Sequence, residues 1–205
     1  MPTTTAQLIL ASQSPRRRYL LEQAGLTVAV IPSTVDESTV RLTDPADYVK
    51  QLAKAKADQV AQKHPDRWVL GADTIVVIGS AILGKPADSQ EARQMLEHLS
   101  GQVHCVYTGY AIVCKDQATV VCDAVRTDVQ FKHLRANEIE WYIRTGEPFD
   151  KAGAYAIQGM GTFLVRKING SYTNVVGLPV CEVIETLLSL GVVSMSLDHA
   201  QGLTP

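Results

Sequence analysis

The sequence predicts an α/β fold, in which helices flank a twisted, mixed sheet within a single domain. The first observation is that short apolar runs alternate with stretches of helical periodicity along most of the chain. The second is a pair of hairpin signals, Gly79-Ser80 and Asn169-Gly170, which add antiparallel partners. No stretch has the composition of a domain linker. We therefore expect one domain over residues 8–191, with two lobes around a central cleft, and a tail over residues 192–205.

The composition excludes several classes of protein. The chain has 205 residues, of which 46% are hydrophobic and 20% charged. Its formal charge of -2 gives no reason to expect a surface that binds nucleic acids or membranes. No apolar run approaches the roughly 20 residues of a membrane span, and the N-terminus lacks the regions of a signal peptide. The four cysteines show no C-x-x-C spacing and the five histidines are scattered. We expect free thiols in a reducing cytoplasm and no zinc site.

A strand-turn-helix stretch near the start carries an unusual charge. Residues 8–11 predict a buried strand, and Ser14 stands at a helix N-cap position before Pro15. Three arginines, residues 16–18, occupy the first turn, where the helix dipole disfavours cations. Unpaired N–H groups, arginines and the hydroxyls of Ser12 and Ser14 together suit a phosphate. The alternative is a solvated basic turn whose arginines pair with surface acids.

A second helix is expected to begin at Asp44-Pro45, with apolar residues spaced along one face. Lys56 lies seven residues after Val49 and four after Leu52, so it falls within this apolar face. A lysine there is costly unless it pairs with an acid or reaches a polar cleft. The alternative is that its aliphatic stem snorkels at the edge of the face.

The most apolar run, Trp68 to Ile78, predicts a central strand, and a break near Gly71 stays open. Asp73 and Thr74 lie inside this run. A carboxylate in such a run is rarely buried unpaired, so Asp73 is expected to pair with a cation, bind a metal or face a cleft. The alternative is a loop between two shorter strands, in which Asp73 caps the turn.

The remaining elements follow the same two periodicities. Strands are expected over residues 28–31, 81–83 and 163–168, and as two long segments within 103–131. Helices are expected from residue 88 or 89 to 99, near 137–145 and near 180–188. Residues 150–174 are rich in glycine and polar side chains, which lets the backbone approach a ligand or turn tightly.

Cations and acids that could meet in the cleft recur at the ends of these elements. The candidate cations are Lys56, Lys85 and Lys151, and the candidate acids are Glu37, Asp73 and Asp150. Phosphate transfer or hydrolysis uses this mixture, because cations hold phosphates while carboxylates bind Mg²⁺ or orient a water. The sequence contains neither a G-x-x-x-x-G-K-[ST] loop nor a G-x-S-x-G elbow, which disfavours P-loop NTPases and serine hydrolases.

A series of short motifs carries a resemblance to a known family. They are, in order, Ser12-Gln13-Ser14-Pro15-Arg16-Arg17, Val35-Asp36-Glu37, Leu52-Ala53-x-x-Lys56-Ala57, Gly71-Ala72-Asp73-Thr74, Gly84-Lys85-Pro86, Asp150-Lys151-Ala152-Gly153-Ala154-Tyr155, Ile157-Gln158-Gly159 and Asn174-Val175-Val176-Gly177-Leu178-Pro179. Through them, residues 8–190 resemble the Maf proteins. The resemblance implies a Maf/Ham1 (ITPase-like) fold. It also implies a cytoplasmic enzyme that cuts a nucleoside triphosphate to the monophosphate and pyrophosphate with a divalent metal.

Three positions separate branches of this family. Arg16, Thr74 and Gln158 resemble the dTTP/UTP branch, whereas the 7-methyl-GTP branch typically has tryptophan in place of that arginine and glutamine in place of that threonine. The sequence departs from the family pattern at two places: Ala156 stands where glycine is common before Ile-Gln-Gly, and Thr173-Asn174 is variable in relatives. Neither place includes one of the matched acids and bases. The resemblance also implies that Asp73 is the proton acceptor.

The combined hypothesis assigns a role to each group of residues. Ser12, Ser14, Arg16 and Arg17 hold the triphosphate, with Asp150 and Lys151 as further substrate-binding residues. Glu37 and Asp73 bind Mg²⁺ or Mn²⁺ and activate water, while Lys56 and Lys85 stabilise charge on the phosphoryl oxygens and the leaving pyrophosphate. Thr74 and Gln158 read the pyrimidine base.

Two alternatives use the same pocket. Maf proteins are also associated with arrest of septum formation, so one alternative is a nucleotide-binding regulator without turnover. The other is 7-methyl-GTP specificity. The resemblance is compatible with a homodimer, and no nucleic-acid or membrane partner is expected.

Overall fold

A long central strand, β4 (Trp68–Ile78), organises the main sheet in the computed structural model, which describes residues 2–4, 8–41 and 43–195. The sheet order is β3-β2-β4-β6-β7-β8, with β5 beside β4. Its other strands are β2 (Leu8–Leu10), β3 (Val28–Val30), β5 (Ala81–Leu83), β6 (Val103–Cys114), β7 (Thr119–Phe131) and β8 (Val165–Asn169). Strand β2 runs parallel to β3 and β4, and all other pairs are antiparallel, which confirms the predicted mixed sheet.

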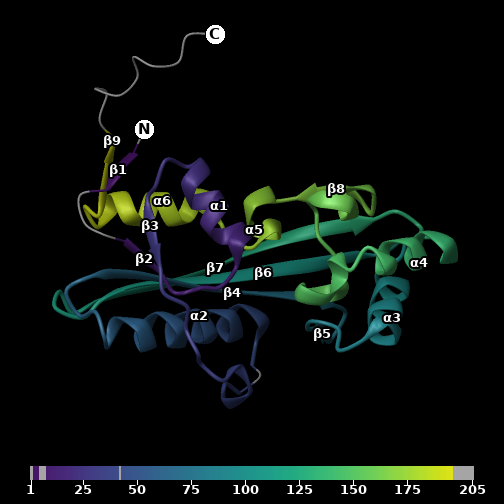
Figure 1. Ribbon diagram of the computed structural model, residues 1–205, viewed down its shortest axis with the longest axis horizontal. Helices are drawn as coiled ribbons and strands as arrows, with labels where there is room; N and C mark the ends of the chain where they lie inside the picture. The colour runs from purple at the N-terminus through teal and green to yellow at the C-terminus, as the bar shows by residue number, and fades with distance from the viewer. Residues whose placement is uncertain (1, 5–7, 42, 196–205) are drawn as a thin grey trace, which may run out of the picture.

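Helices cover both faces of this sheet (Figure 1). The α-helices are α1 (Pro15–Gln23), α2 (Pro45–Ala61), α3 (Ser89–Leu99), α4 (Ala136–Arg144), α5 (Tyr172–Val176) and α6 (Val180–Ser189). Short 3₁₀ turns are η1 (Glu37–Thr39), η2 (Glu147–Asp150), η3 (Ala152–Ala154) and η4 (Gly159–Phe163). Helix α2 lies on one face, whereas α1 and α6 lie on the other.

Alternation along the strands divides the core between these faces. On β2, Leu8 and Leu10 pack with α1 and α6, and Ile9 packs with α2. A further apolar cluster, built by α3, α4 and the far ends of β4, β6 and β7, includes the fully buried Tyr142 and Phe131. The apolar clusters under α1 and α3 therefore lie over different ends of β4.

Helix α2 approaches the sheet closely because two strand positions are glycine. A Cβ atom at Gly71 would lie 2.2 Å from the carbonyl oxygen of Ala53, and one at Gly109 would lie 2.4 Å from that of Val49. Strand β4 is continuous through Gly71, so the interpretation of Asp73 as a turn cap between two strands is wrong. The glycine serves helix packing rather than a break.

One edge of β4 is open at its centre. Strand β2 pairs with Trp68–Leu70, and β5 pairs with residues 76–78 on the same edge, while β6 pairs along the other. Among the residues that the structure describes, no strand therefore lies beside residues 71–75 on that edge. Asp73 and Thr74 lie in this gap.

Two further expectations differ from the structure. Asn169-Gly170 does not form a hairpin, because β8 leads into α5. Residues 193–195, which the sequence predicts as part of the tail, form β9 (Val193–Met195), which pairs antiparallel with β1 (Pro2–Thr4). The rest of that tail, residues 196–205, lies outside the described residues. Within the described part of the chain, no helix is long and apolar enough to cross a membrane.

Candidate functional site

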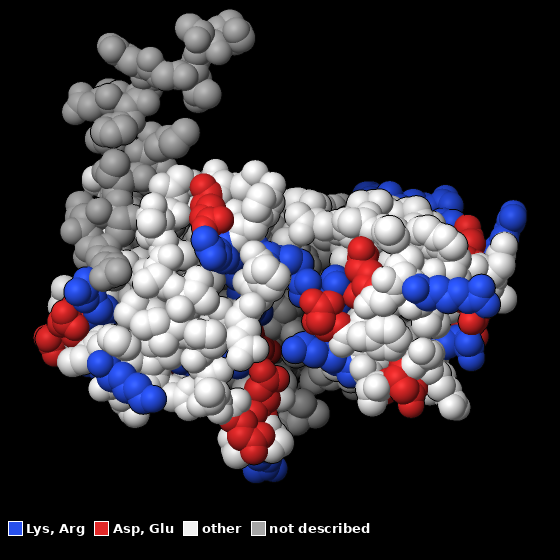
Figure 2. All heavy atoms as spheres, in the orientation of Figure 1, with Lys and Arg blue, Asp and Glu red and all other residues white. Residues whose placement is uncertain are grey.

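A cavity of about 670 Å³ opens at the free edge of β4. All of the site residues predicted from the sequence line it, namely Ser12, Ser14, Arg16, Arg17, Glu37, Lys56, Asp73, Thr74, Lys85, Asp150, Lys151 and Gln158. They come from the turn before α1, from α1, η1, α2, β4, the loop after β5, and the segment from η2 to η4. Figure 2 shows acidic and basic side chains close together in the middle of the face that carries this hollow.

Lys56 joins the two carboxylates on the α2 side. Its Nζ atom donates to Glu37 Oε1 at 2.7 Å and to Asp73 Oδ1 at 2.6 Å. The side chains of Lys56 and Asp73 are only 13% and 10% exposed, whereas that of Glu37 is 57% exposed. Of the alternatives left open for Lys56, the structure shows the ion pair with an acid at a polar cavity, where the close approach of α2 brings the lysine to β4.

Burial raises the pKa of the Asp73 carboxyl, and the nearby charges of Lys56 and Arg17 act against this rise. The carboxylate of Asp73 is therefore largely removed from water, and the ammonium group of Lys56 offsets its charge. A carboxylate with a raised pKa is a better proton acceptor than an exposed one.

Tyr48 also lines the α2 side of the cavity, although it was not among the residues selected from the sequence. It lies four residues before Leu52 and eight before Lys56, so helical spacing places the three on one face. That spacing was the available signal. Burial, Asp73 and Glu37 raise the pKa of the Tyr48 hydroxyl, which therefore holds its proton.

The N-terminus of α1 is uncapped and points at the cavity. Ser14 is the N-cap residue, but its side chain makes no capping hydrogen bond, and no acid lies in the first turn. Free N–H groups and the Ser14 hydroxyl remain for an anion. The alternative of arginines paired with acids holds for two of the three, because Arg16 contacts Asp150 at 3.0 Å and Arg18 contacts Glu22 at 2.7 Å.

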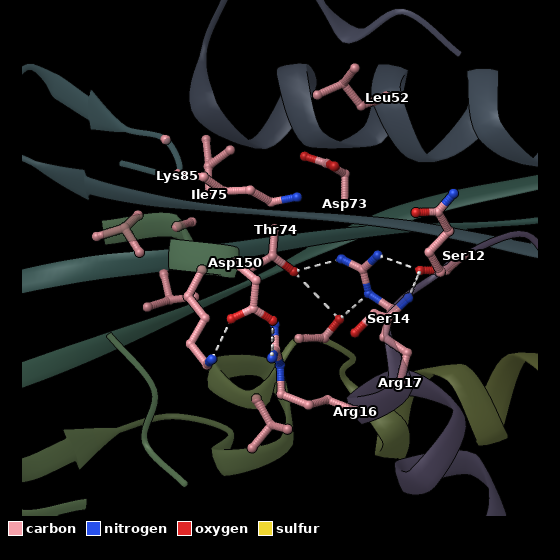
Figure 3. A pocket seen from close by; sticks show the side chains of 18 of the residues that line it. Ser12, Ser14, Arg16, Arg17, Leu52, Asp73, Thr74, Ile75, Lys85 and Asp150 are labelled. Atoms are coloured by element: carbon pink, nitrogen blue, oxygen red, sulfur yellow. Dashed lines mark hydrogen bonds and ion pairs between the residues drawn. The ribbon is translucent and has the colours of Figure 1, made fainter. Parts of the chain in front are cut away.

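Arg17 is used by the protein itself. Its side chain is buried, and Nε donates to the carbonyl of Gly177 at 2.8 Å. Nη1 donates to Ser12 Oγ at 3.0 Å and to the carbonyl of Ala72 at 2.9 Å, and Nη2 donates to Thr74 Oγ1 at 3.0 Å (Figure 3). Since Ala72 belongs to the open part of β4, Arg17 supplies a donor where a neighbouring strand would otherwise do so.

Thr74 faces away from Asp73, on the α1 side of the sheet. Besides accepting from Arg17, its hydroxyl lies 2.9 Å from Thr108 Oγ1, and Thr108 donates to the carbonyl of Asn174 at 3.0 Å. The hydroxyl of Thr74 is therefore engaged within the protein. Thr108 and Asn174 were not selected from the sequence, and each is fully buried. The available signal for Asn174 was its place in one of the motifs that carry the family resemblance, Asn174-Val175-Val176-Gly177-Leu178-Pro179.

The turn η2 and the residue after it bring a short chain of charged side chains to the cavity. Asp150 accepts from Arg16, and Lys151 Nζ pairs with Asp150 at 2.5 Å and donates to the carbonyl of Glu147 at 2.7 Å. Burial acts to raise the pKa of Asp150, but the hydrogen bonds from Lys151 and Arg16 outweigh it and lower the pKa. Within the described residues, the amide of Gln158 and the ammonium of Lys85 have no hydrogen-bond partner, so both are available to a ligand.

The donor set on the α2 side fits a divalent cation. Glu37 and Asp73 each place a carboxylate oxygen on one shared cationic group, Lys56 Nζ. Mg²⁺ is commonly bound by one or two carboxylates, with substrate phosphates completing its oxygen ligands. Across the described part of the chain there is no cluster of three or more acidic, histidine or cysteine side chains that could hold a metal by itself. The two carboxylates therefore suit a metal that arrives with a phosphate.

The fold and the cleft thus define a mixed α/β protein whose open sheet edge carries an uncapped helix N-terminus and a pair of carboxylates bridged by a lysine. A sequence model described as Maf-like protein matches residues 7–190. A dTTP/UTP pyrophosphatase of Syntrophus aciditrophicus is 49% identical over 199 residues, covering 97% of each chain. A dTTP/UTP pyrophosphatase of Geotalea uraniireducens is 52% identical over 193 residues, covering 94% of this chain and 100% of that one.

The chain belongs to the Maf family. Among solved structures, a HAM1 protein from Coxiella burnetii matches with a TM-score of 0.43 and 20% identity, over 62% of this chain and 73% of the other.

Proposed function

We propose that this protein hydrolyses UTP and dTTP to the nucleoside monophosphate and pyrophosphate in the cytoplasm. The observation that carries the proposal is the Lys56 ammonium between Glu37 and Asp73, at the same cavity as the open N-terminus of α1. Relatives about half identical to this chain are named dTTP/UTP pyrophosphatases, which supports the choice of substrates.

The phosphates are held on the α1 side of the cavity. The Ser14 hydroxyl and the N–H groups of the first turn bind phosphate oxygens, and Arg16 and Lys85 offset their charge. Arg17 keeps the turn and β4 in place through Ser12 and the Ala72 carbonyl. Asp150 and Lys151 set the position of Arg16 from the other side.

Asp73 accepts the proton of the attacking water, and Lys56 stabilises the charge that develops on the phosphoryl oxygens. The anhydride bond between the α- and β-phosphates breaks, and pyrophosphate leaves with the electron pair beside Lys85. Glu37 and Asp73 would hold Mg²⁺ or Mn²⁺, which would neutralise phosphate charge and polarise the reacting phosphoryl group. Gln158 pairs with the O and N–H edge of uracil or thymine.

Replacing Asp73 by asparagine tests this assignment. We expect kcat for pyrophosphate release from UTP to fall by about 10²- to 10⁴-fold, because the amide cannot accept the proton. The panel should contain UTP, dTTP, CTP, GTP and 7-methyl-GTP, each with Mg²⁺ or Mn²⁺. Preference for 7-methyl-GTP would retain the chemistry and overturn the proposed specificity. Tight nucleotide binding without release by the unmodified protein would instead indicate a nucleotide-binding regulator.

The pH dependence provides a second test. Because burial raises the pKa of Asp73, the base protonates at a higher pH than an ordinary aspartate, whose pKa is about 3.9. Activity depends on the unprotonated form, so kcat/KM should decline on the acid side already above that value. A profile of kcat/KM against pH at subsaturating metal checks this, because a divalent cation bound to Asp73 would itself lower the pKa of that carboxyl. Constant activity down to about pH 4 would contradict the role of Asp73.

A further inference from the structure

The segment that carries Gln158 is held by side chains rather than by a sheet or a long helix. Gln158 precedes η4 (Gly159–Phe163), a short 3₁₀ turn. The carboxylate of Glu147 accepts hydrogen bonds from the N–H groups of Met160 and Gly161, each at 3.0 Å. The Glu147 carboxylate therefore holds two backbone N–H groups that lie just after Gln158.

Tyr142 completes the arrangement from α4. Its hydroxyl donates to Glu147 Oε1 at 2.8 Å and accepts from the N–H of Ala156 at 3.1 Å. The Tyr142 side chain is fully buried, and burial together with its bond to Glu147 raises the pKa of the phenol. The hydroxyl thus keeps its proton and remains the donor to the carboxylate. The backbone is fixed two residues before Gln158 and again two and three residues after it.

Two glycines in the segment, Gly159 and Gly161, allow its backbone to lie against Glu147 and Tyr142. Gly159 has a φ of +65°, and a Cβ atom there would lie 2.5 Å from Glu147 Oε2. A Cβ atom at Gly161 would lie 2.3 Å from the Ala156 carbonyl and 2.7 Å from the Tyr142 hydroxyl. Any side chain at either position would displace the segment from Glu147 or Tyr142.

We propose that Tyr142 and Glu147 are positioning residues that set pyrimidine selectivity, acting through Gln158. The inference rests on the proposed function, because it assumes that Gln158 reads the base. An amide can distinguish uracil from cytosine only if its donor and acceptor face the base in a fixed orientation, and the Tyr142–Glu147 pair fixes the backbone from which it projects. Lys56 and Asp73 line the cavity, whereas Tyr142 and Glu147 are not among its lining residues, so the pair orients the base without taking part in the chemical step.

The experiment compares UTP with CTP in Glu147→Gln and Tyr142→Phe. Glutamine keeps one acceptor but turns an NH₂ group toward backbone donors, and phenylalanine removes the hydroxyl with little change of shape. We expect each variant to raise KM for UTP by about tenfold and to reduce the UTP/CTP ratio of kcat/KM, while kcat for UTP changes by less than about threefold. Glu140→Gln is the matched control, because Glu140 lies on α4, the helix of Tyr142, but pairs with Arg93 at the surface.

A double variant separates positioning from a general structural effect. If Glu147 acts through Gln158, Glu147→Gln should change the UTP/CTP ratio in the parent protein but not in the Gln158→Ala background. An unchanged ratio in folded Glu147→Gln and Tyr142→Phe, or an equal change in both backgrounds, would overturn the proposal.

Binding of UTP and CTP to the same variants in an Asp73→Asn background measures selectivity without turnover. The positioning role predicts the same loss of the UTP/CTP ratio there, and retention of the ratio would contradict it. Failure of the proposed catalytic function would appear separately, as absence of pyrophosphate release by the unmodified protein.

Discussion

Asp73 and Thr74 are neighbours on β4, yet the two sides of the sheet use them differently. On the α2 side, Asp73 and Glu37 share Lys56, and the cavity remains open to these charged groups. On the α1 side, Thr74 contacts Arg17 and Thr108, and these groups are engaged by the protein. In the proposed function, Asp73 and Lys56 on the α2 side therefore act on the phosphate, whereas Arg17 and Thr74 on the α1 side maintain the cavity.

The difference follows from strand alternation and from the partners that each face offers. Successive side chains of a strand point to opposite faces, so a carboxylate and a hydroxyl at adjacent positions meet different helices. Helix α2 presents the ammonium of Lys56. In the proposed function this group turns to a phosphate when its two carboxylate partners bind a metal. Helix α1 presents a guanidinium whose fixed fork already matches carbonyl and hydroxyl oxygens around it.

The largest expected effect is on the α2 side. Replacing Lys56 by methionine removes the cation between Glu37 and Asp73, and we expect kcat/KM for UTP to fall by about 10²- to 10³-fold. Steady-state pyrophosphate release measures this. Lys54→Met is the control, because Lys54 lies on the exposed side of α2 and pairs with Asp58. Activity close to that of the parent in Lys56→Met would remove the basis for placing the chemistry on this side.

Arg17→Lys tests the α1 side with an intermediate effect. Lysine retains the charge but cannot reach the Gly177 and Ala72 carbonyls together with two hydroxyls, so we expect unfolding free energy to fall by about 3 kcal/mol. Denaturant unfolding measures the change, with Arg18→Lys as the exposed control on the same turn. Unchanged stability combined with a loss of activity as large as that of Lys56→Met would place Arg17 on the triphosphate, as expected from the sequence.

The smallest effect is expected at Thr108. Valine has a similar shape but removes the hydroxyl between Thr74 and the Asn174 carbonyl, which should cost about 1–2 kcal/mol of stability. Thermal unfolding and UTP turnover on the same preparation separate the two outcomes. We expect kcat to change by less than about threefold, and Thr27→Val, at an exposed position just before β3, should alter neither quantity. A marked loss of turnover without loss of stability would move catalysis to both sides of β4.

The elements were predicted where one periodicity dominated the sequence. The long run at Trp68–Ile78 and the apolar face of α2 each appear as predicted, and Asp44 caps α2 through the N–H of Ala46. The Asn169-Gly170 hairpin failed because local turn preference does not determine the structure of the next residues, which here begin α5. Likewise, Gly71 suggested a break, although its role is visible only once α2 lies against the sheet.

Membership of the site was easier to predict than the role of each residue. Charge in an apolar context identified Lys56 and Asp73, because either would be costly if buried alone. The sequence could not show that Arg17 donates to the carbonyls of Ala72 and Gly177, since these acceptors lie 55 and 160 residues away. For the same reason, Glu147 could not be connected with Gln158, because the contact depends on the folded path of residues 156–161.

The open edge of β4 has a consequence for association between molecules. An unpaired strand edge can accept a strand from another chain, which is a common start of aggregation. Here the Ala72 carbonyl on that edge already accepts a hydrogen bond from buried Arg17. A foreign strand would have to displace a guanidinium and leave its charge without these acceptors. Arg17 therefore makes the free edge a poor template for intermolecular β-pairing, while leaving it accessible to a small anionic molecule.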